Sequence, residues 1–246
     1  MAGDRIRVSG LLRARLRLEM AVFQVGVRLL RLGVNALFMV EGPRQDVDPE
    51  RAAAYDALLA GGGEIDYRLP YPRHEFLSYA VHCHDLLAHG SNAPDIAEFE
   101  PRPAGEAIAV QLGVHGAADG IWPMYFATVA RLTRPGSLLL SNGCVYTGRG
   151  DRVRRYYYFA ISRDPDEPDT WTDGTVYLLP RDTFRRLRGQ EWISEVPVRP
   201  RAWLRVSPDD FPFRRSTVRC VWPEPIGRTR RRFWRRHRQI TLTEPG

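Results

Sequence analysis

The pattern of hydrophobic and polar positions changes from helical to strand-like near residue 85. Residues 1–45 carry leucines and valines at helical spacing, interrupted by arginines, and this predicts a long amphipathic helix. The helix either packs on the body, lies on a membrane surface, or is a weakly ordered extension before a true start at Met20 or Met39. We favour the first or the third alternative over membrane contact, because amphipathic helices of soluble proteins mostly bury their apolar stripe.

Residues 46–84 are predicted to form a helical linker region. Asp48-Pro49-Glu50 is typical of a helix start, with a capping side chain followed by proline at the first helical position. This helix should stop at the glycines of residues 61–63. A second helix is predicted over residues 73–82.

Residues 85–213 contain short runs of strand-forming residues separated by turn residues. One helix interrupts them, predicted from residue 119 to 132 and ending before Pro135. The strands are predicted at residues 86–89, 108–114, 137–140, 156–162, 175–179, 195–198 and 203–206. Many strands with few helices indicate a compact α+β domain, because alternating βαβ units would need a helix between most strands.

Charge separates the remaining segment from the body. Residues 214–246 hold ten arginines and two glutamates, a net charge of +8, whereas the whole chain carries +7, so residues 1–213 sum to −1. We therefore expect residues 214–246 to form an arginine-rich, disordered tail.

Several classes of protein are excluded or disfavoured by residues that the sequence lacks. It contains no lysine, which excludes a P-loop lysine and a lysine Schiff base. It also has no G-x-S-x-G or G-x-G-x-x-G motif. Its three cysteines form no C-x-x-C pair, and no run of 18 uncharged apolar residues predicts a transmembrane helix. We expect a cytoplasmic protein.

His89, Gly90 and Ser91 are the best candidates for a binding site, because they form a compact polar cluster at the end of a predicted strand. Glycine leaves its backbone groups open to a ligand, and the neighbouring side chains donate and accept hydrogen bonds. His82, Cys83 and His84 look like a metal cluster, but residues two apart on a helix point to different faces. We therefore expect no metal site there.

The segment Leu87-Ala88-His89-Gly90-Ser91 resembles the first strand of the ADP-ribosyltransferase fold, in the class of poly-ADP-ribose polymerases and diphtheria-type toxins. In that class a second strand is followed by a helix with a tyrosine, and Tyr125 after residues 113–117 is similar in spacing. A third element is a glutamate entering a late strand; Glu195 resembles it, with Glu191 as second choice. The resemblance covers residues 85–213 and implies a compact split β-sheet domain.

The resemblance also implies roles for these residues, with NAD as substrate and cofactor. The Gly90 backbone would hold the nicotinamide carboxamide, and His89 beside Ser91 would bind a ribose hydroxyl. Tyr125 would stack on the cationic ring. Glu195 would be the catalytic carboxylate, stabilising positive charge on the ribose as nicotinamide leaves.

The sequence departs from the family's pattern at two nicotinamide contacts. His115 stands near the position of the family's second aromatic residue. Trp122 stands where many members have a serine.

Two functions of different class remain open. The first is NAD-dependent ADP-ribosyl transfer to an unknown protein or nucleic-acid acceptor, with the RNA 2′-phosphotransferase branch of the same fold as a variant. The alternative is a non-catalytic binding protein of this fold, or a nucleic-acid-binding module that uses the arginine-rich tail. Arginines interleaved with Phe233 and Trp234 are suited to contact phosphates and stack on bases.

Overall fold

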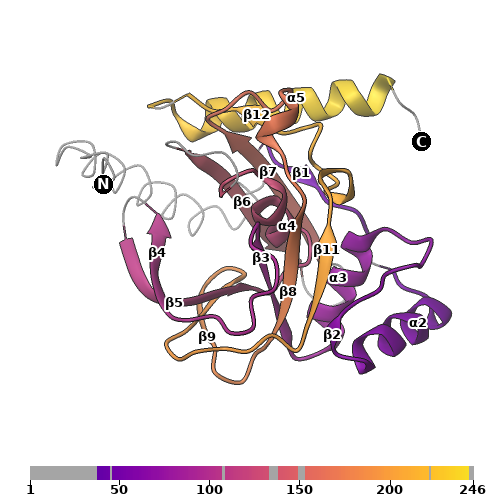
Figure 1. The fold of residues 1–246 in the computed structure, drawn as a ribbon. Coiled ribbons are helices and arrows are strands. Elements are labelled where there is room, and N and C mark those ends of the chain that lie inside the picture. Colours follow the sequence, from indigo (N-terminus) through magenta and orange to yellow (C-terminus); the bar gives the residue numbers. More distant parts are fainter. Residues whose placement is uncertain are drawn as a thin grey trace.

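The computed structural model describes residues 38–44, 46–106, 109–132, 138–148, 153–221 and 223–243. These residues form four α-helices and twelve strands arranged in two sheets, so the fold is α+β as the patterning predicts (Figure 1). The amphipathic helix predicted over residues 1–45 lies almost wholly outside the described residues.

Two helices precede the strand-rich part, and both were predicted. In α2 (Pro49–Ala60), the side chain of Asp48 accepts the N–H of Arg51 at 2.9 Å. The helix ends at Gly61, and α3 (Arg73–Cys83) follows. The two helices are joined by Glu75, whose carboxylate accepts hydrogen bonds from the Tyr55 hydroxyl at 2.6 Å and from Arg51 at 3.2 Å.

The larger sheet has the strand order β2-β11-β8-β3-β5-β10-β9. β4 also pairs with β5, and every pairing except that of β2 with β11 is antiparallel. Its strands are β2 (Gly63–Glu64), β3 (Leu86–Ser91), β4 (Arg102–Glu106), β5 (Ala109–Ala117), β8 (Gly174–Pro180), β9 (Arg185–Arg188), β10 (Glu191–Ser194) and β11 (Ala202–Val206).

The smaller sheet is built around β7 (Arg154–Ile161). β6 (Leu140–Thr147) pairs with β7 along its whole length, while β1 (Val40–Glu41) and β12 (Val218–Arg219) pair with successive parts of it. Two 3₁₀ turns, Pro168–Thr170 and Pro208–Asp210, complete the regular structure of the described residues.

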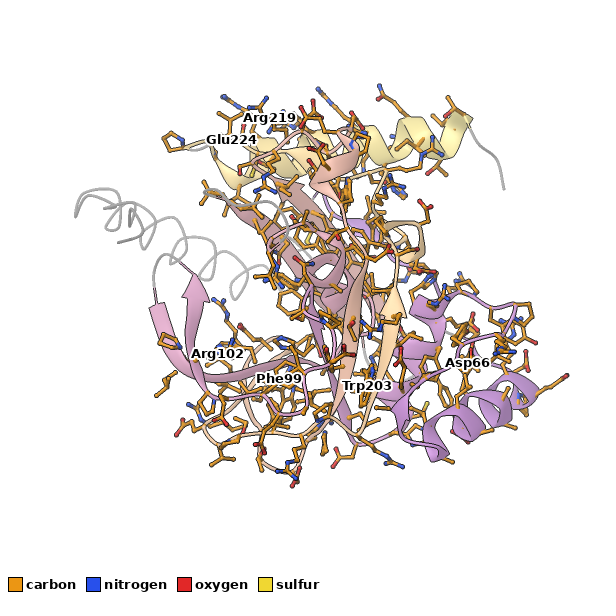
Figure 2. All side chains as sticks on the ribbon, viewed as in Figure 1. Asp66, Phe99, Arg102, Trp203, Arg219 and Glu224 are labelled. Carbon is orange, nitrogen blue, oxygen red and sulfur yellow. The ribbon has the colours of Figure 1, made fainter. Side chains whose placement is uncertain are left out.

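The two sheets share a core around the short helix α4 (Trp122–Thr128). Its Tyr125 ring packs against Phe159 of β7 and Phe211, with ring centroids 4.9 and 5.8 Å apart. A second, smaller cluster includes Phe99 and packs on the other face of the larger sheet. Phe99 lies toward the end of the molecule remote from α5 (Figure 2).

The sequence predicts a disordered tail over residues 214–246, and this prediction is wrong for most of the segment. Ile226–Thr243 form the helix α5, which packs on β7 and β12 (Figure 1). Phe233 is its fully buried anchor and packs against Phe159 and Phe213. Burial of one aromatic side chain stabilises the folded state by a few kcal/mol. The net charge of the segment gives no indication of this stabilisation.

Three further expectations need correction. The helix predicted over residues 119–132 is only seven residues long, because Asp119 caps its start and the chain turns at Val129. The strand predicted at residues 195–198 is absent, and β10 ends at Ser194 immediately before it. The strand predicted at residues 137–140 instead begins at Leu140, while residue 137 lies outside the described residues.

Within the described part of the chain, none of the helices combines the length and the apolar character needed to cross a bilayer.

Candidate functional site

The larger sheet opens between β3 and β5, and the predicted motif lies at this opening. The two strands share a single pair of opposed residues, Ala88 and Ala117. In the same antiparallel register, Gly90 would stand opposite His115, but no pairing continues there. We call this opening, between Gly90 and His115, the split.

Side chains take the backbone carbonyls that the missing ladder would have paired. The Nδ1 atom of His89 lies 2.6 Å from the carbonyl oxygen of His115. The guanidinium of Arg131 donates to the carbonyl of Gly90 at 3.3 Å. His89 thus spans the split from β3 to β5, whereas Arg131 covers the Gly90 carbonyl from the segment after α4.

His89 is a neutral histidine. Burial lowers its pKa to about 4, and the nearby charge of Arg131 acts in the same direction. A neutral ring that donates from Nδ1 to the His115 carbonyl carries its lone pair on Nε2, so this nitrogen is a hydrogen-bond acceptor. The ring packs against Phe99, with centroids 4.7 Å apart.

Gly90 allows α4 to lie directly on β3. A Cβ atom on Gly90 would lie 1.9 Å from the carbonyl oxygen of Pro123 and 2.9 Å from the backbone nitrogen of Ala127. Ser91 is nearly buried, and its hydroxyl accepts the N–H of Ala93 at 3.1 Å. A ligand could therefore reach only the backbone N–H and C=O groups of Gly90, because α4 covers its Cα. The Ser91 hydroxyl stabilises the turn after β3.

Asn92 and Arg131 fasten the end of α4 to the end of β3, and sequence reasoning missed Arg131. The Asn92 side-chain oxygen accepts the backbone N–H groups of Arg131 and Leu132 at 2.7 and 3.1 Å. Arg131 also donates to the carbonyl of Phe126, and its guanidinium lies 5.6 Å from that ring. An arginine 39 residues from Asn92 gives no local signal, so only the fold identifies it.

His115 and Glu191 form a half-buried pair beside the split. His115 Nδ1 lies 3.1 Å from Oε1 of Glu191, whose other oxygen accepts from Arg188 at 2.8 Å. Burial would raise the pKa of Glu191, but the hydrogen bonds from His115 and Arg188 outweigh it and hold the pKa below its ordinary value. The Nε2 atom of His115 is buried and has no hydrogen-bond partner among the described residues.

Glu195 has a different environment from Glu191. Its side chain is 66% exposed and pairs with Arg185 at 2.7 Å, beyond the end of β10. Within the described part of the chain it makes no hydrogen bond to a residue of the split. The geometry therefore favours Glu191, the second choice from the sequence, as the carboxylate of this site.

Tyr125 does not line the split. It is fully buried, and its hydroxyl donates to the carbonyl of Ala160 at 2.9 Å. The half-buried aromatic residues of α4 are instead Trp122 and Phe126, whose rings lie 6.1 Å apart. The expected stacking role of Tyr125 is thus inconsistent with its position, because its ring lies in the core. Phe126, the next residue, is on a different face of the helix.

The two histidines beside Cys83 do not converge on one point. His82 contacts the carbonyl of Ser78 and the hydroxyl of Tyr146, while His84 pairs with Asp56 at 2.9 Å. Within the described residues no group of three or more histidine, cysteine or acidic side chains is arranged to hold a metal ion.

No protein-family model, no curated protein and no solved structure gives a significant match to this chain. The site must therefore be interpreted from its own chemistry. It combines a stretch of strand edge that no neighbouring strand pairs, a neutral histidine acceptor and a carboxylate held ionised by two donors.

Proposed function

We propose that the protein binds NAD at the split and transfers its ADP-ribosyl group to an acceptor, with Glu191 as the catalytic carboxylate. The observation that carries the proposal is the opening of the sheet between Gly90 and His115, with Glu191 paired to His115 beside it.

The sheet order supports the proposal. The strand with His89 and Gly90, the strand with His115, and the strand with Glu191 are consecutive neighbours, β3-β5-β10. Paired strands lie about 4.8 Å apart, which applies to β5 and β10, and across the split the Nδ1 atom of His89 lies 2.6 Å from the carbonyl oxygen of His115. The three elements that carry the resemblance to ADP-ribosyltransferases therefore lie within reach of one nicotinamide riboside unit.

Three residues face the same side of the sheet as α4. The missing side chain of Gly90 points at α4, and Ala88 on the same face is opposed to Ala117. His115 is two residues from Ala117 in β5. Glu191 of β10 stands directly opposite Ala117. Because residues two apart share a face and opposed residues do also, His115 and Glu191 project toward the α4 side.

The chemistry of each residue fits one part of NAD. The backbone of Gly90 would hold the carboxamide after displacement of the Arg131 guanidinium. The Nε2 atom of His89, whose ring packs on Phe99 on the face opposite α4, would accept a ribose hydroxyl from that side of the split. The unpartnered Nε2 of His115 suits a further polar ligand atom. Phe126 takes the place proposed from the sequence for Tyr125, because its ring lies beside Arg131 at the Gly90 edge.

Glu191 would act on the bond that breaks. The glycosidic C–N bond opens and nicotinamide leaves with the electron pair, while positive charge develops on the ribose. A carboxylate held ionised by His115 and Arg188 stabilises that charge. The lone pair of the acceptor then bonds to the anomeric carbon, and the acceptor loses a proton.

The test compares Glu191 with Glu195 in the full chain. NAD binding is measured by calorimetry, and nicotinamide release is measured by chromatography. We expect Glu191→Gln to lower nicotinamide release by roughly 100-fold, with a much smaller change in affinity, because it removes charge stabilisation of the transition state. Glu195→Gln is the matched control and should leave both quantities near those of the wild type, because its carboxylate is exposed and, among the described residues, pairs with Arg185 alone.

Two results would contradict the proposal in different ways. Absence of NAD binding at millimolar ligand would exclude the function itself. A loss of turnover in Glu195→Gln with an active Glu191→Gln variant would leave the function and reverse the catalytic assignment.

A further inference from the structure

The arginines of α5 divide into two groups with different surroundings. An inner group faces the body of the protein, and an outer group is exposed to solvent. The outer arginines are Arg228, Arg231, Arg235 and Arg238, all exposed. Their spacing of three, four and three residues puts them on one side of the helix.

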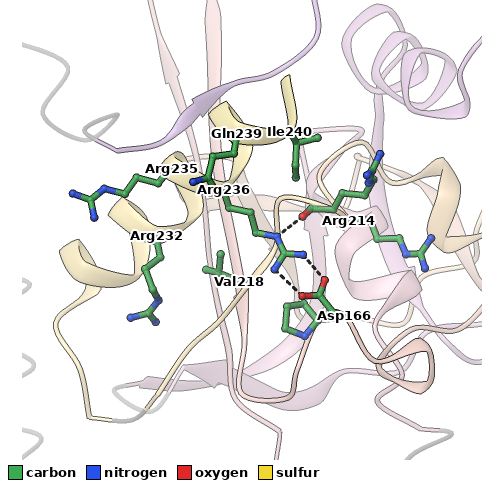
Figure 3. Close-up of a pocket in the computed structure, with 10 residues that line it drawn as sticks. Asp166, Arg214, Val218, Arg232, Arg235, Arg236, Gln239 and Ile240 are labelled. Carbon is green, nitrogen blue, oxygen red and sulfur yellow. Dashed lines mark hydrogen bonds and ion pairs between the residues drawn. The ribbon is translucent and has the colours of Figure 1, made fainter. Parts of the chain in front are cut away.

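The inner arginines hold the helix to the body. Arg236 pairs with Asp166 and also donates to the carbonyl of Arg215 at 2.6 Å (Figure 3). Arg232 pairs with Glu224 and donates to the carbonyl of Arg219. The carboxylate partners of Arg232 and Arg236 compensate their charge, and the third inner arginine, Arg230, lies over the ring of Tyr158 at 4.6 Å.

The outer arginines have no carboxylate partner among the described residues. Arg231 lies over the ring of Phe38 at 4.8 Å, and Arg238 lies over the ring of Trp234 at 4.9 Å. Ring contacts orient a guanidinium without neutralising it. The four charges are therefore available to an external anion.

A basic groove of about 800 Å³ adjoins this row (Figure 3). Its lining includes Arg235, which has no carboxylate partner among the described residues, and three arginines that are paired with carboxylates, namely Arg214 with Asp209, Arg232 with Glu224 and Arg236 with Asp166. Arg235 belongs both to the groove and to the outer row. The charged surface is thus continuous from the outer row into the groove.

We propose that this surface binds the sugar-phosphate backbone of a single-stranded nucleic acid. Arg228 and Arg238 are about 15 Å apart along the helix axis, a length comparable to several phosphate spacings. Exposed guanidinium groups suit phosphate oxygens, and the neighbouring Phe38 and Trp234 rings suit stacking. The concave groove beside the row favours an extended chain over a flat lipid surface.

The proposal is independent of the function proposed above, because it concerns the smaller sheet and α5. The split lies in the larger sheet, between β3 and β5. Absence of NAD binding would not contradict the nucleic-acid proposal. Absence of nucleic-acid binding would not contradict the NAD proposal.

The test uses the full chain and measures binding of fluorescent oligo-uridine RNA and oligo-thymidine DNA, each of about 20 nucleotides, by anisotropy. The variant replaces all four outer arginines by glutamine: Arg228→Gln, Arg231→Gln, Arg235→Gln and Arg238→Gln. We expect at least a tenfold loss of affinity at low salt. We also expect the slope of log affinity against log salt to become shallower by roughly 3, because each phosphate neutralised on a single strand contributes roughly 0.7.

A matched control removes the same charge from other exposed positions. It carries Arg68→Gln, Arg102→Gln, Arg199→Gln and Arg201→Gln, and Arg102 lies at the end of the molecule remote from α5 (Figure 2). This control should retain the wild-type slope. Circular dichroism and thermal melting establish that both variants are folded.

The outcomes are separated by further probes, namely vesicles containing phosphatidylserine and poly-glutamate. Loss of RNA or DNA binding in the outer-row variant alone supports the proposal. Equal losses in both variants would overturn it in favour of a general charge effect. Binding only to vesicles or only to poly-glutamate would also overturn it, in favour of a membrane or a protein partner.

Discussion

At the scale of single residues, Asp119 connects α4 to the smaller sheet. It is fully buried, and one carboxylate oxygen accepts the backbone N–H groups of Ile121 and Trp122 at 2.9 and 2.6 Å. The other accepts the hydroxyls of Tyr146 and Tyr157 at 2.7 and 2.6 Å. A buried carboxylate with this many donors is satisfied, and it fixes the start of the helix that lies on Gly90.

We therefore expect Asp119→Asn to destabilise the protein by about 2–4 kcal/mol. An amide presents an NH₂ group to one set of these donors and leaves buried hydrogen-bonding groups unpaired. Urea unfolding followed by fluorescence measures the change.

Asp56→Asn is the matched control for Asp119→Asn. Asp56 accepts from Tyr79 and His84 at the surface, with a side chain that is 52% exposed. We expect Asp56→Asn to leave the free energy of unfolding nearly unchanged, because exposed ion pairs contribute little to stability. An equal loss in the free energy of unfolding for the two variants would show that Asp119 does not connect α4 to the smaller sheet as its hydrogen bonds indicate.

At the scale of elements, α4 depends on two glycines in the strands beneath it. Gly90 of β3 and Gly174 of β8 each have a backbone carbonyl of α4 where a Cβ atom would be, at 1.9 and 2.0 Å. The carbonyls belong to Pro123 and Ala127. Close packing of the helix on the sheet is thus possible only without side chains at these two positions.

The prediction at this scale is that Gly90→Ala destabilises the protein by about 3 kcal/mol, because the new methyl group meets backbone atoms that cannot rotate away. Gly227→Ala in α5 provides a control of opposite sign. A Cβ atom there meets nothing within 4 Å, so the change should stabilise by about 0.5–1 kcal/mol through the unfolded state. Thermal melting of both variants checks the two signs, and a neutral Gly90→Ala would contradict the close approach.

At the scale of the whole molecule, burial makes several histidines resist protonation. It lowers the pKa of His74, His82, His89 and His237, and for His89 the value is about 4. In the unfolded chain these groups titrate near 6.5. The unfolded state therefore binds more protons than the folded state as pH falls below 6.5.

The free energy of unfolding should consequently fall between pH 7 and pH 5, and each such proton contributes up to about 1.4 kcal/mol per pH unit. His89 contributes to this fall from pH 6.5 down to about 4. Urea unfolding at pH 7, 6 and 5 measures the slope.

His89→Asn isolates one of these protons. The asparagine amide retains a donor for the carbonyl of His115 but does not titrate. We expect a shallower slope than in the wild type, by up to one proton. An unchanged slope would mean that His89 does not stay neutral in the folded protein.

The sequence by itself determined the elements whose signals are local. The Asp48-Pro49 start of α2, the second helix, and the strand that carries His89 and Gly90 all follow from periodicity and from capping or turn residues. It also determined the α+β class and the concentration of positive charge after residue 214. These features depend on residues that are close to one another in the sequence, so they can be predicted from the sequence alone.

Only the tertiary structure decided which residues surround the split and what becomes of the arginine-rich segment. Glu191 faces His115 and Arg131 reaches Gly90 across 76 and 41 residues, while Tyr125 is directed into the core. Burial of Phe233 against the smaller sheet makes a helix of a segment whose charge indicates disorder. These outcomes depend on packing between distant elements, and a hydrophobic or charged residue carries no local record of its partner.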